Sequence, residues 1–150
     1  MTSEWEILLR VVLAAVFGGM IGFDRRIKHK PAGIRTHMLV AMGSALAVGV
    51  SALVVEETAG AANADAVRVA AGVITGVGFL GAGAIMRTPD GVRGLTTAAG
   101  IWVTAAIGIA LGFGFYGVAA GSTILAIIII SLLADLDSPG YGDDSPPPET

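Results

Sequence analysis

The stretch "GVITGVGFLGAGAIM", residues 72–86, decides how the whole sequence is interpreted. It contains "GVGFLG", which matches the GxGxxG pattern of dinucleotide-binding folds. That fingerprint requires a strand before the first glycine, a helix that begins there and an acidic residue about 20 positions later. Here the glycines lie inside an apolar run, and the nearest acidic residue downstream, Asp90, belongs to the proline–glycine turn "TPDG". The stretch therefore predicts a glycine-rich helix in lipid and not a nucleotide site.

The composition agrees with a membrane protein. Apolar residues make up 54% of the chain, not counting 22 glycines, and charged residues only 14%. Soluble domains are about half apolar and about a quarter charged. The charges are also confined to a few places, with long uncharged runs between them. Because the chain has no cysteine, disulfides and thiolate metal sites are excluded.

The lengths of the apolar runs predict the number of spans. A hydrocarbon core about 30 Å thick is crossed by about 20 helical residues. The last uncharged run, residues 94–134, would form a helix about 60 Å long, so we expect it to fold back at "GFGFYG", residues 112–117. The sequence thus predicts an all-α bundle of about five transmembrane helices within a domain of residues 1–136. The expected spans are residues 7–23, 36–55, 67–86, 95–111 and 115–134, followed by a disordered, acidic, Pro/Gly-rich tail at 137–150.

The distribution of charge predicts the orientation. Most basic residues fall in two connections, with Arg25, Arg26, Lys28, Lys30 and Arg35 in the first and Arg87 and Arg93 in the second. The positive-inside rule places both connections in the cytoplasm, the N-terminus outside and the C-terminus inside. The first span is not a cleaved signal, since its positive charges follow the apolar run.

The glycines are expected to mediate helix packing. They recur at spacings that bring them onto one face of a helix, and small residues let helices approach closely in lipid. The expected packing positions are Gly18, Gly22, Gly72, Gly76, Gly78, Gly81 and Gly83. Because residues 67–86 hold most of them, this span is expected to be the central helix.

A few charged residues lie near the ends of the spans, and the sequence offers some of them a pairing partner. Arg10 lies inside the first span, and Glu6 four residues earlier can pair with it along the helix. Asp65 and Arg68 bracket the start of the third span, either as a cap with a local ion pair or as a polar cluster at the mouth of the bundle. His37 is interpreted as structural rather than as a ligand.

Two further segments have a similar sequence pattern and are predicted to lie on the same side of the membrane. "KPAGIRTH", residues 30–37, and "VRGLTTAAG", residues 92–100, both place a basic residue and a glycine just before a span, and they could form one surface. Thr96 or Thr97 can cap the exposed amides at the start of the helix that residues 92–100 open. With two histidines, scattered carboxylates and no nucleophile–base pair, the sequence predicts no catalytic site, no metal site and no cofactor.

Three segments of the sequence resemble those of a known protein family. "GGMIGFDRRIKHKPAGIRTHMLVAMGSAL", "DAVRVAAGVITGVGFLGAGAIM" and "VRGLTTAAGIWVTAAIGIALGFGFY" closely resemble the membrane domain of the MgtC/SapB family, over about residues 7–134. The resemblance implies a bacterial inner-membrane protein linked to magnesium limitation and survival inside host cells, which acts on membrane partners such as the F-type ATP synthase. It also implies a functional polar cluster of Asp24, Arg25, Lys30, Arg35, Thr36, Asp65, Arg68, Arg93, Thr96 and Thr97, together with Pro31, Gly33 and Gly94.

The sequence departs from the family pattern at several positions. The family usually has glutamate where Asp24 stands, often a second acid at Arg26, glutamine at Gly72 and commonly proline at Ala66. Loss of the glutamine removes an amide from the membrane interior. Many members also carry a soluble C-terminal domain, whereas the resemblance here covers the membrane domain without it.

Three function classes follow. The first is a non-enzymatic regulator whose partners are the lipid bilayer and other membrane proteins, including ATP synthase subunits, with no nucleic acid. The second is a transporter or channel for magnesium or another cation; against it, Asp24 and Asp65 are expected at opposite membrane faces, about 30 Å apart, so they cannot share one ion. The third is a bare structural or lipid-binding bundle. Assembly into homo-oligomers is compatible with each class.

Overall fold

The computed structural model describes residues 3–57, 66–89 and 91–132, and within them the predicted all-α membrane fold is confirmed. The predicted tail at 137–150 and Asp65 lie outside the described residues. Four of the helices are long and apolar enough to cross a membrane, and the described part of the last one is slightly shorter. The elements are α1 (Glu4–Ile27), α2 (Ile34–Glu57), α3 (Ala66–Ala84), β1 (Met86–Thr88), β2 (Gly91–Arg93), α4 (Leu95–Gly112) and α5 (Tyr116–Leu132).

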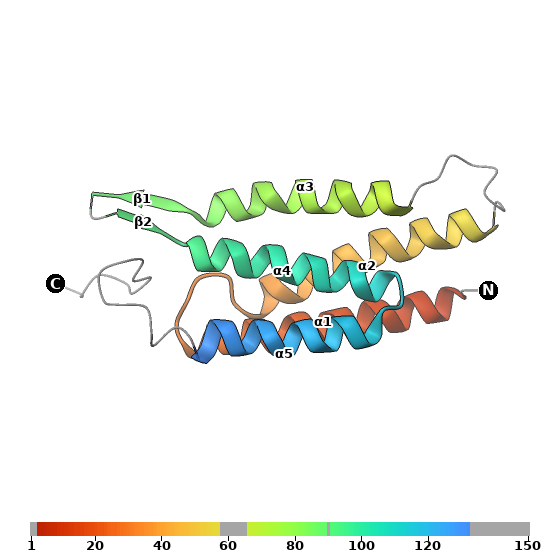
Figure 1. The fold of residues 1–150 in the computed structure, drawn as a ribbon, viewed down its shortest axis with the longest axis horizontal. Helices are drawn as coiled ribbons and strands as arrows, with labels where there is room; N and C mark the ends of the chain where they lie inside the picture. Colours follow the sequence, from red (N-terminus) through yellow and green to blue (C-terminus); the bar gives the residue numbers. More distant parts are fainter. Residues whose placement is uncertain (1–2, 58–65, 90, 133–150) are drawn as a thin grey trace.

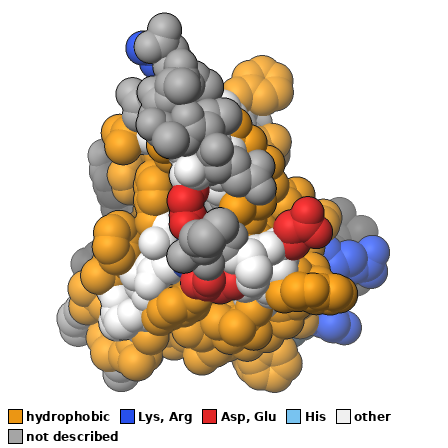
Figure 2. Space-filling model, turned by 90° about the vertical axis from the view of Figure 1, so that its right-hand side faces the viewer, with side chains coloured by type: hydrophobic (Ala, Val, Ile, Leu, Met, Phe, Trp, Pro, Cys, Tyr) orange, Lys and Arg blue, Asp and Glu red, His pale blue; other side chains and the backbone are white. Residues whose placement is uncertain are grey.

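The helices run side by side and give the bundle two chemically different ends (Figure 1). At the basic end lie the end of α1, the start of α2, the β1–β2 hairpin and the end of α5. At the acidic end lie the start of α1, the end of α2 and the α4–α5 turn. Figure 2 views the acidic end and shows acidic side chains gathered among hydrophobic ones. The connections predicted to share one side of the membrane therefore do meet at one end of the fold.

The central helix is α4 and not α3, so the expectation from the glycine content was wrong. Helix α4 packs against all four other helices, whereas α3 packs mainly against α2 and α4. Half of the spanning stretch of α4 is buried, compared with 11% for α3. Glycine content alone did not decide which helix is central, because a glycine lets two helices approach closely only where it faces the other helix.

The closest packing joins α2 to α1 and α4 through glycines. A Cβ at Gly18 would overlap the backbone carbonyl of His37, and one at Gly22 would lie 2.6 Å from Ile34 Cα. On α4, a Cβ at Gly108 would overlap the Ala41 carbonyl. Side chains larger than hydrogen are therefore excluded where α2 meets its two neighbours.

On α3 the expected glycine packing is absent at four of the positions. No described residue lies within 4 Å of where a Cβ would stand at Gly72, Gly76, Gly78 or Gly83. Only Gly81 meets another helix, with Ala98 Cβ at 3.7 Å. Among the described residues these four glycines therefore do not take part in the expected helix packing: Gly72, Gly76 and Gly83 lie on the side of α3 turned away from the bundle, and Gly78 lies on an open flank.

The connection between α3 and α4 is a β-hairpin, of which the sequence predicted only the turn. Met86 pairs with Arg93, and Arg87 with Val92. Gly94 follows the hairpin with φ +87, and a Cβ there would overlap the Ala84 carbonyl. Since φ is positive and the space is closed, only glycine fits at this position, and the hairpin is held against the end of α3.

Alanine at Gly18 should destabilise the bundle, because its Cβ must displace the backbone of α2. We expect Gly18→Ala to lower the unfolding free energy by about 1–3 kcal/mol, measured by denaturant titration in detergent micelles with circular dichroism. Gly76→Ala is the matched control: it adds the same methyl group to an open position, so its stability should equal that of the wild type or slightly exceed it. Equal losses in both variants would contradict this packing.

Candidate functional site

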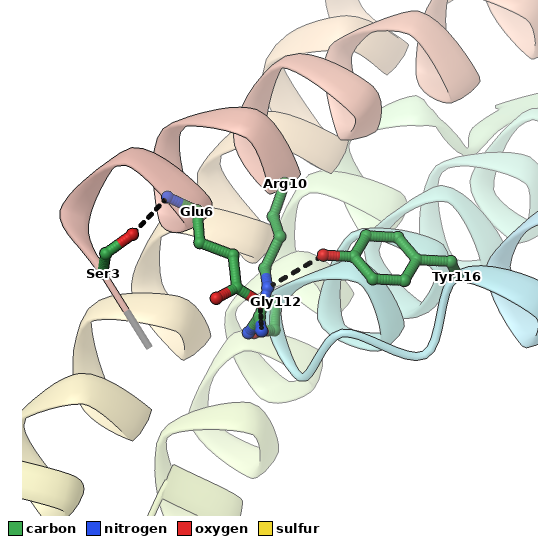
Figure 3. A network of polar contacts seen from close by, with 5 residues as sticks. All are labelled: Ser3, Glu6, Arg10, Gly112 and Tyr116. Carbon is green, nitrogen blue, oxygen red and sulfur yellow. Dashed lines mark hydrogen bonds and ion pairs between the residues drawn. The ribbon is translucent and has the colours of Figure 1, made fainter. Parts of the chain in front are cut away.

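Arg10 organises the acidic end of the bundle (Figure 3). It is 8% exposed and donates from Nη1 to the Gly112 carbonyl at 2.8 Å and from Nε to the Tyr116 hydroxyl at 3.3 Å. Its Nη2 lies 2.5 Å from Glu6 Oε1, so the predicted pair along the helix is confirmed. An arginine inside a membrane needs compensation of this kind. One side chain thus fixes the start of α1 to the α4–α5 turn.

The α4–α5 turn is built around this arginine. As the sequence predicted, the chain reverses at "GFGFYG": α4 ends at Gly112, and Gly114 N donates to Leu111 O at 2.8 Å. Gly114 has φ +83, and a Cβ there would lie 3.0 Å from Arg10 Nη2. Sequence reasoning missed the contacts of Arg10 with this turn, since they join residues more than 100 positions apart.

At the basic end, Asp24 and Lys28 fix α1 to α5. Ser131 Oγ donates to Asp24 Oδ1, and Lys28 Nζ donates to the Ser131 carbonyl at 3.0 Å. Lys28 Nζ also lies 3.6 Å from Asp24 Oδ1. The second oxygen, Asp24 Oδ2, is buried and has no hydrogen-bond partner among the described residues. Ser131 was not predicted, although it is the polar residue that ends the isoleucine run of α5.

Arg25 joins α1 to the start of α4. Its Nη2 donates to Thr97 Oγ1 at 2.5 Å, and the two residues are 3% and 1% exposed. Helix α4 is capped by Gly94 without a side-chain hydrogen bond. The expectation that Thr96 or Thr97 caps this helix was therefore wrong: Thr97 lies past the cap, and its hydroxyl points to Arg25.

A third buried contact lies deeper, between α2 and α4. His37 is fully buried, and its Nδ1 lies 2.8 Å from Thr104 Oγ1. Because Thr104 donates its only hydroxyl proton to the Gly100 carbonyl at 2.8 Å, its oxygen accepts from His37, and Nδ1 carries the ring proton. His37 Nε2 has no hydrogen-bond partner among the described residues. The structural interpretation of this histidine fits the geometry, but its partner Thr104 was not predicted.

The predicted polar residues do not form one compact site. Asp24, Arg25 and Thr97 lie near one another at the basic end, where Lys30, Arg35, Thr36, Arg93 and Thr96 are half-buried or exposed. Arg68 lies at the start of α3, which is about 28 Å long, and so it is far from Asp24. Within residues 3–57, 66–89 and 91–132, no three His, Cys, Asp or Glu side chains group as a metal site would require.

Comparison with known proteins gives consistent matches. The MgtC family profile matches residues 11–138. The chain is 41% identical over 138 residues to "Putative magnesium transporter YhiD" of Escherichia coli K12, covering 91% of this chain and 63% of that protein. It is 43% identical over 123 residues to Protein MgtC of Brucella abortus, covering 82% and 49%. Protein MgtC of Salmonella typhimurium is 38% identical over 128 residues, covering 85% and 52%.

These relatives are longer than the present chain, which spans about half to two thirds of their length. No solved structure matches.

Valine at Thr97 should destabilise the basic end, because it removes the oxygen that accepts from the buried Arg25. We expect Thr97→Val to cost about 1–3 kcal/mol of unfolding free energy, while Thr97→Ser, which keeps the hydroxyl, should stay near the wild type. Thr96→Val, at the exposed position just before Thr97, is the control. If Thr96→Val and Thr97→Val have the same unfolding free energy, the contact between Arg25 and Thr97 contributes nothing to stability.

Proposed function

Because the chain belongs to the MgtC family, we propose that this multi-pass membrane protein is a non-enzymatic regulator that acts through other membrane proteins. In this proposal it lies in the bacterial inner membrane, with its basic end in the cytoplasm as the positive-inside rule requires. It serves adaptation to magnesium limitation or stress inside a host cell, and the candidate partners are subunits of the F-type ATP synthase.

The observation that carries this proposal is the outer face of α3. Gly72, Gly76 and Gly83 recur at spacings of four and seven, so they lie on one face, and no described residue is near them. Val77 and Gly81, which are buried, lie on the opposite face toward α4. Association of helices in lipid depends on close van der Waals packing, which glycine permits. A glycine face that the chain itself does not use is suited to a helix of a partner.

Phe79 adds shape to the same face. It lies between Gly76 and Gly83 and is 82% exposed. The large ring of Phe79 protrudes beside the flat surface of the glycines. Aromatic anchors of this kind concentrate binding energy. By contrast, Gly18 and Gly22 of α1 and Gly108 of α4 are used for packing inside the bundle.

The alternative function is transport of magnesium or another cation. It is favoured by the name of the relative from Escherichia coli and by the unpartnered oxygen of Asp24. Against it, the acidic residues of the described helices all lie in first or last turns: Glu4 and Glu6, Asp24, Glu56 and Glu57. Substrate sites of secondary transporters lie near the middle of the membrane, and Mg²⁺ is usually held by one or two carboxylates.

Capture from native membranes tests the regulatory function. The wild type should enrich specific membrane subunits, and Gly76→Leu should lose them, because leucine prevents close approach to α3. Gly121→Leu is the matched control: this glycine of α5 is also exposed and open, so its substitution should leave capture unchanged. The same two variants should differ in growth at limiting magnesium, with only Gly76→Leu impaired. Capture that is equal in both variants, or absent from the wild type, would contradict docking on α3.

A flux assay tests the alternative. Purified protein in liposomes should give no more magnesium or proton flux than empty liposomes, because no carboxylate of a described helix lies at mid-membrane. Robust flux that Asp24→Asn abolishes would replace the regulatory proposal with transport.

A further inference from the structure

An apolar groove separates α3 from α4 on the flank of α3 next to the bundle. Its volume is about 330 Å³, and it is open to the outside. The helices touch at its base, where Gly81 meets Ala98, and Trp102, 46% exposed, is among the side chains that line it. The residues that matter here are Gly78 and Gly81 of α3, Ile85 just after it, and Ala98, Ala99 and Trp102 of α4. The groove is distinct from the outer glycine face of α3.

The length and position of the groove restrict its occupant. From Val77 to Ile85 it extends about 12 Å at 1.5 Å per residue. A spanning helix would need contact over about 30 Å, whereas one leaflet supplies about half of that depth. The groove reaches the basic end of the bundle, because Ile85 directly precedes β1. It therefore matches an acyl chain from the leaflet at that end better than a helix of another protein.

The hairpin places positive charge where that acyl chain would meet its headgroup. The walls of the groove, α3 and α4, are joined by the hairpin, so the groove leads to it (Figure 1). Arg87 pairs with Val92 and Arg93 with Met86, and successive residues of a strand point to opposite faces. Each face of the ribbon thus carries one arginine, and Arg87 is exposed. The planar guanidinium binds phosphate oxygens in a bidentate manner.

We propose that this groove binds an anionic phospholipid, with one acyl chain between α3 and α4 over Gly78 and Gly81 and the phosphate on Arg87. The indole of Trp102 lines the groove beside the chain. The arginine selects the charge of the lipid, and the small residues at the base of the groove make room for its chain. This binding does not depend on the proposed regulatory function, since it uses another face of α3.

Native mass spectrometry of the purified chain in detergent tests both halves of the site. Phosphatidylglycerol should bind more tightly than phosphatidylcholine. Arg87→Gln should weaken phosphatidylglycerol binding about fivefold, the effect of one basic residue at an anionic surface, and should weaken phosphatidylcholine binding less, because the choline group offsets the charge of its phosphate. Arg26→Gln, which removes an exposed arginine of α1 at the same end, is the control and should change neither. Equal losses in the two arginine variants would overturn a specific headgroup site.

The acyl half is tested by filling the groove. Gly78→Leu should reduce binding of both lipids, because its side chain occupies the path of the acyl chain, and it should fold, because the position is open. Gly72→Leu, at an open glycine on the outer face of the same helix, should bind like the wild type. A photoreactive benzoylphenylalanine at Ala99 should form adducts with phospholipid in native membranes. Adducts with protein instead, or equal binding by the two leucine variants, would overturn the proposal.

Discussion

The structure depends on the close approach of α2 to α1 and α4, which is possible only because glycines stand at the contacts. Gly18 and Gly22 admit the start of α2 against α1, and Gly108 admits its middle against α4. In lipid, helices gain little from burying apolar surface, so tight packing and hydrogen bonds must hold them together. The approach brings His37 against Thr104, a contact that wider spacing would break.

The buried polar groups connect helices that are distant in sequence. Arg10 joins α1 to the α4–α5 turn, Arg25 joins α1 to α4, and Asp24 and Lys28 join α1 to α5. In a medium of low dielectric constant an unpaired polar group is costly, so each of these contacts also specifies which helices are neighbours. The outcome is a four-helix core of α1, α2, α4 and α5 whose two ends are fixed by side chains.

Helix α3 is the least buried of the described helices. It is held along one side by α2 and α4 and at its end by the hairpin, while Gly72, Gly76, Gly83 and Phe79 face away from the bundle. A helix held on one side can meet lipid or protein without disturbing the core. Both proposals above place binding there, on different faces of the helix, because α3 leaves most of its glycines without contacts inside the bundle.

The sequence by itself determined the membrane class, five helices, the reversal at residues 112–117, the Glu6–Arg10 pair and the MgtC-type motifs. These follow from hydropathy, length and spacing along one helix, which are local properties. Only the tertiary structure decided that α4 is central, that Thr97 accepts a hydrogen bond from Arg25 instead of capping the helix, and that Ser131 donates one to Asp24. In a soluble helix a polar face marks the outside, but these helices are apolar all round because lipid replaces water. Their neighbours are therefore set by the shapes of packed surfaces, which no run of residues displays on its own.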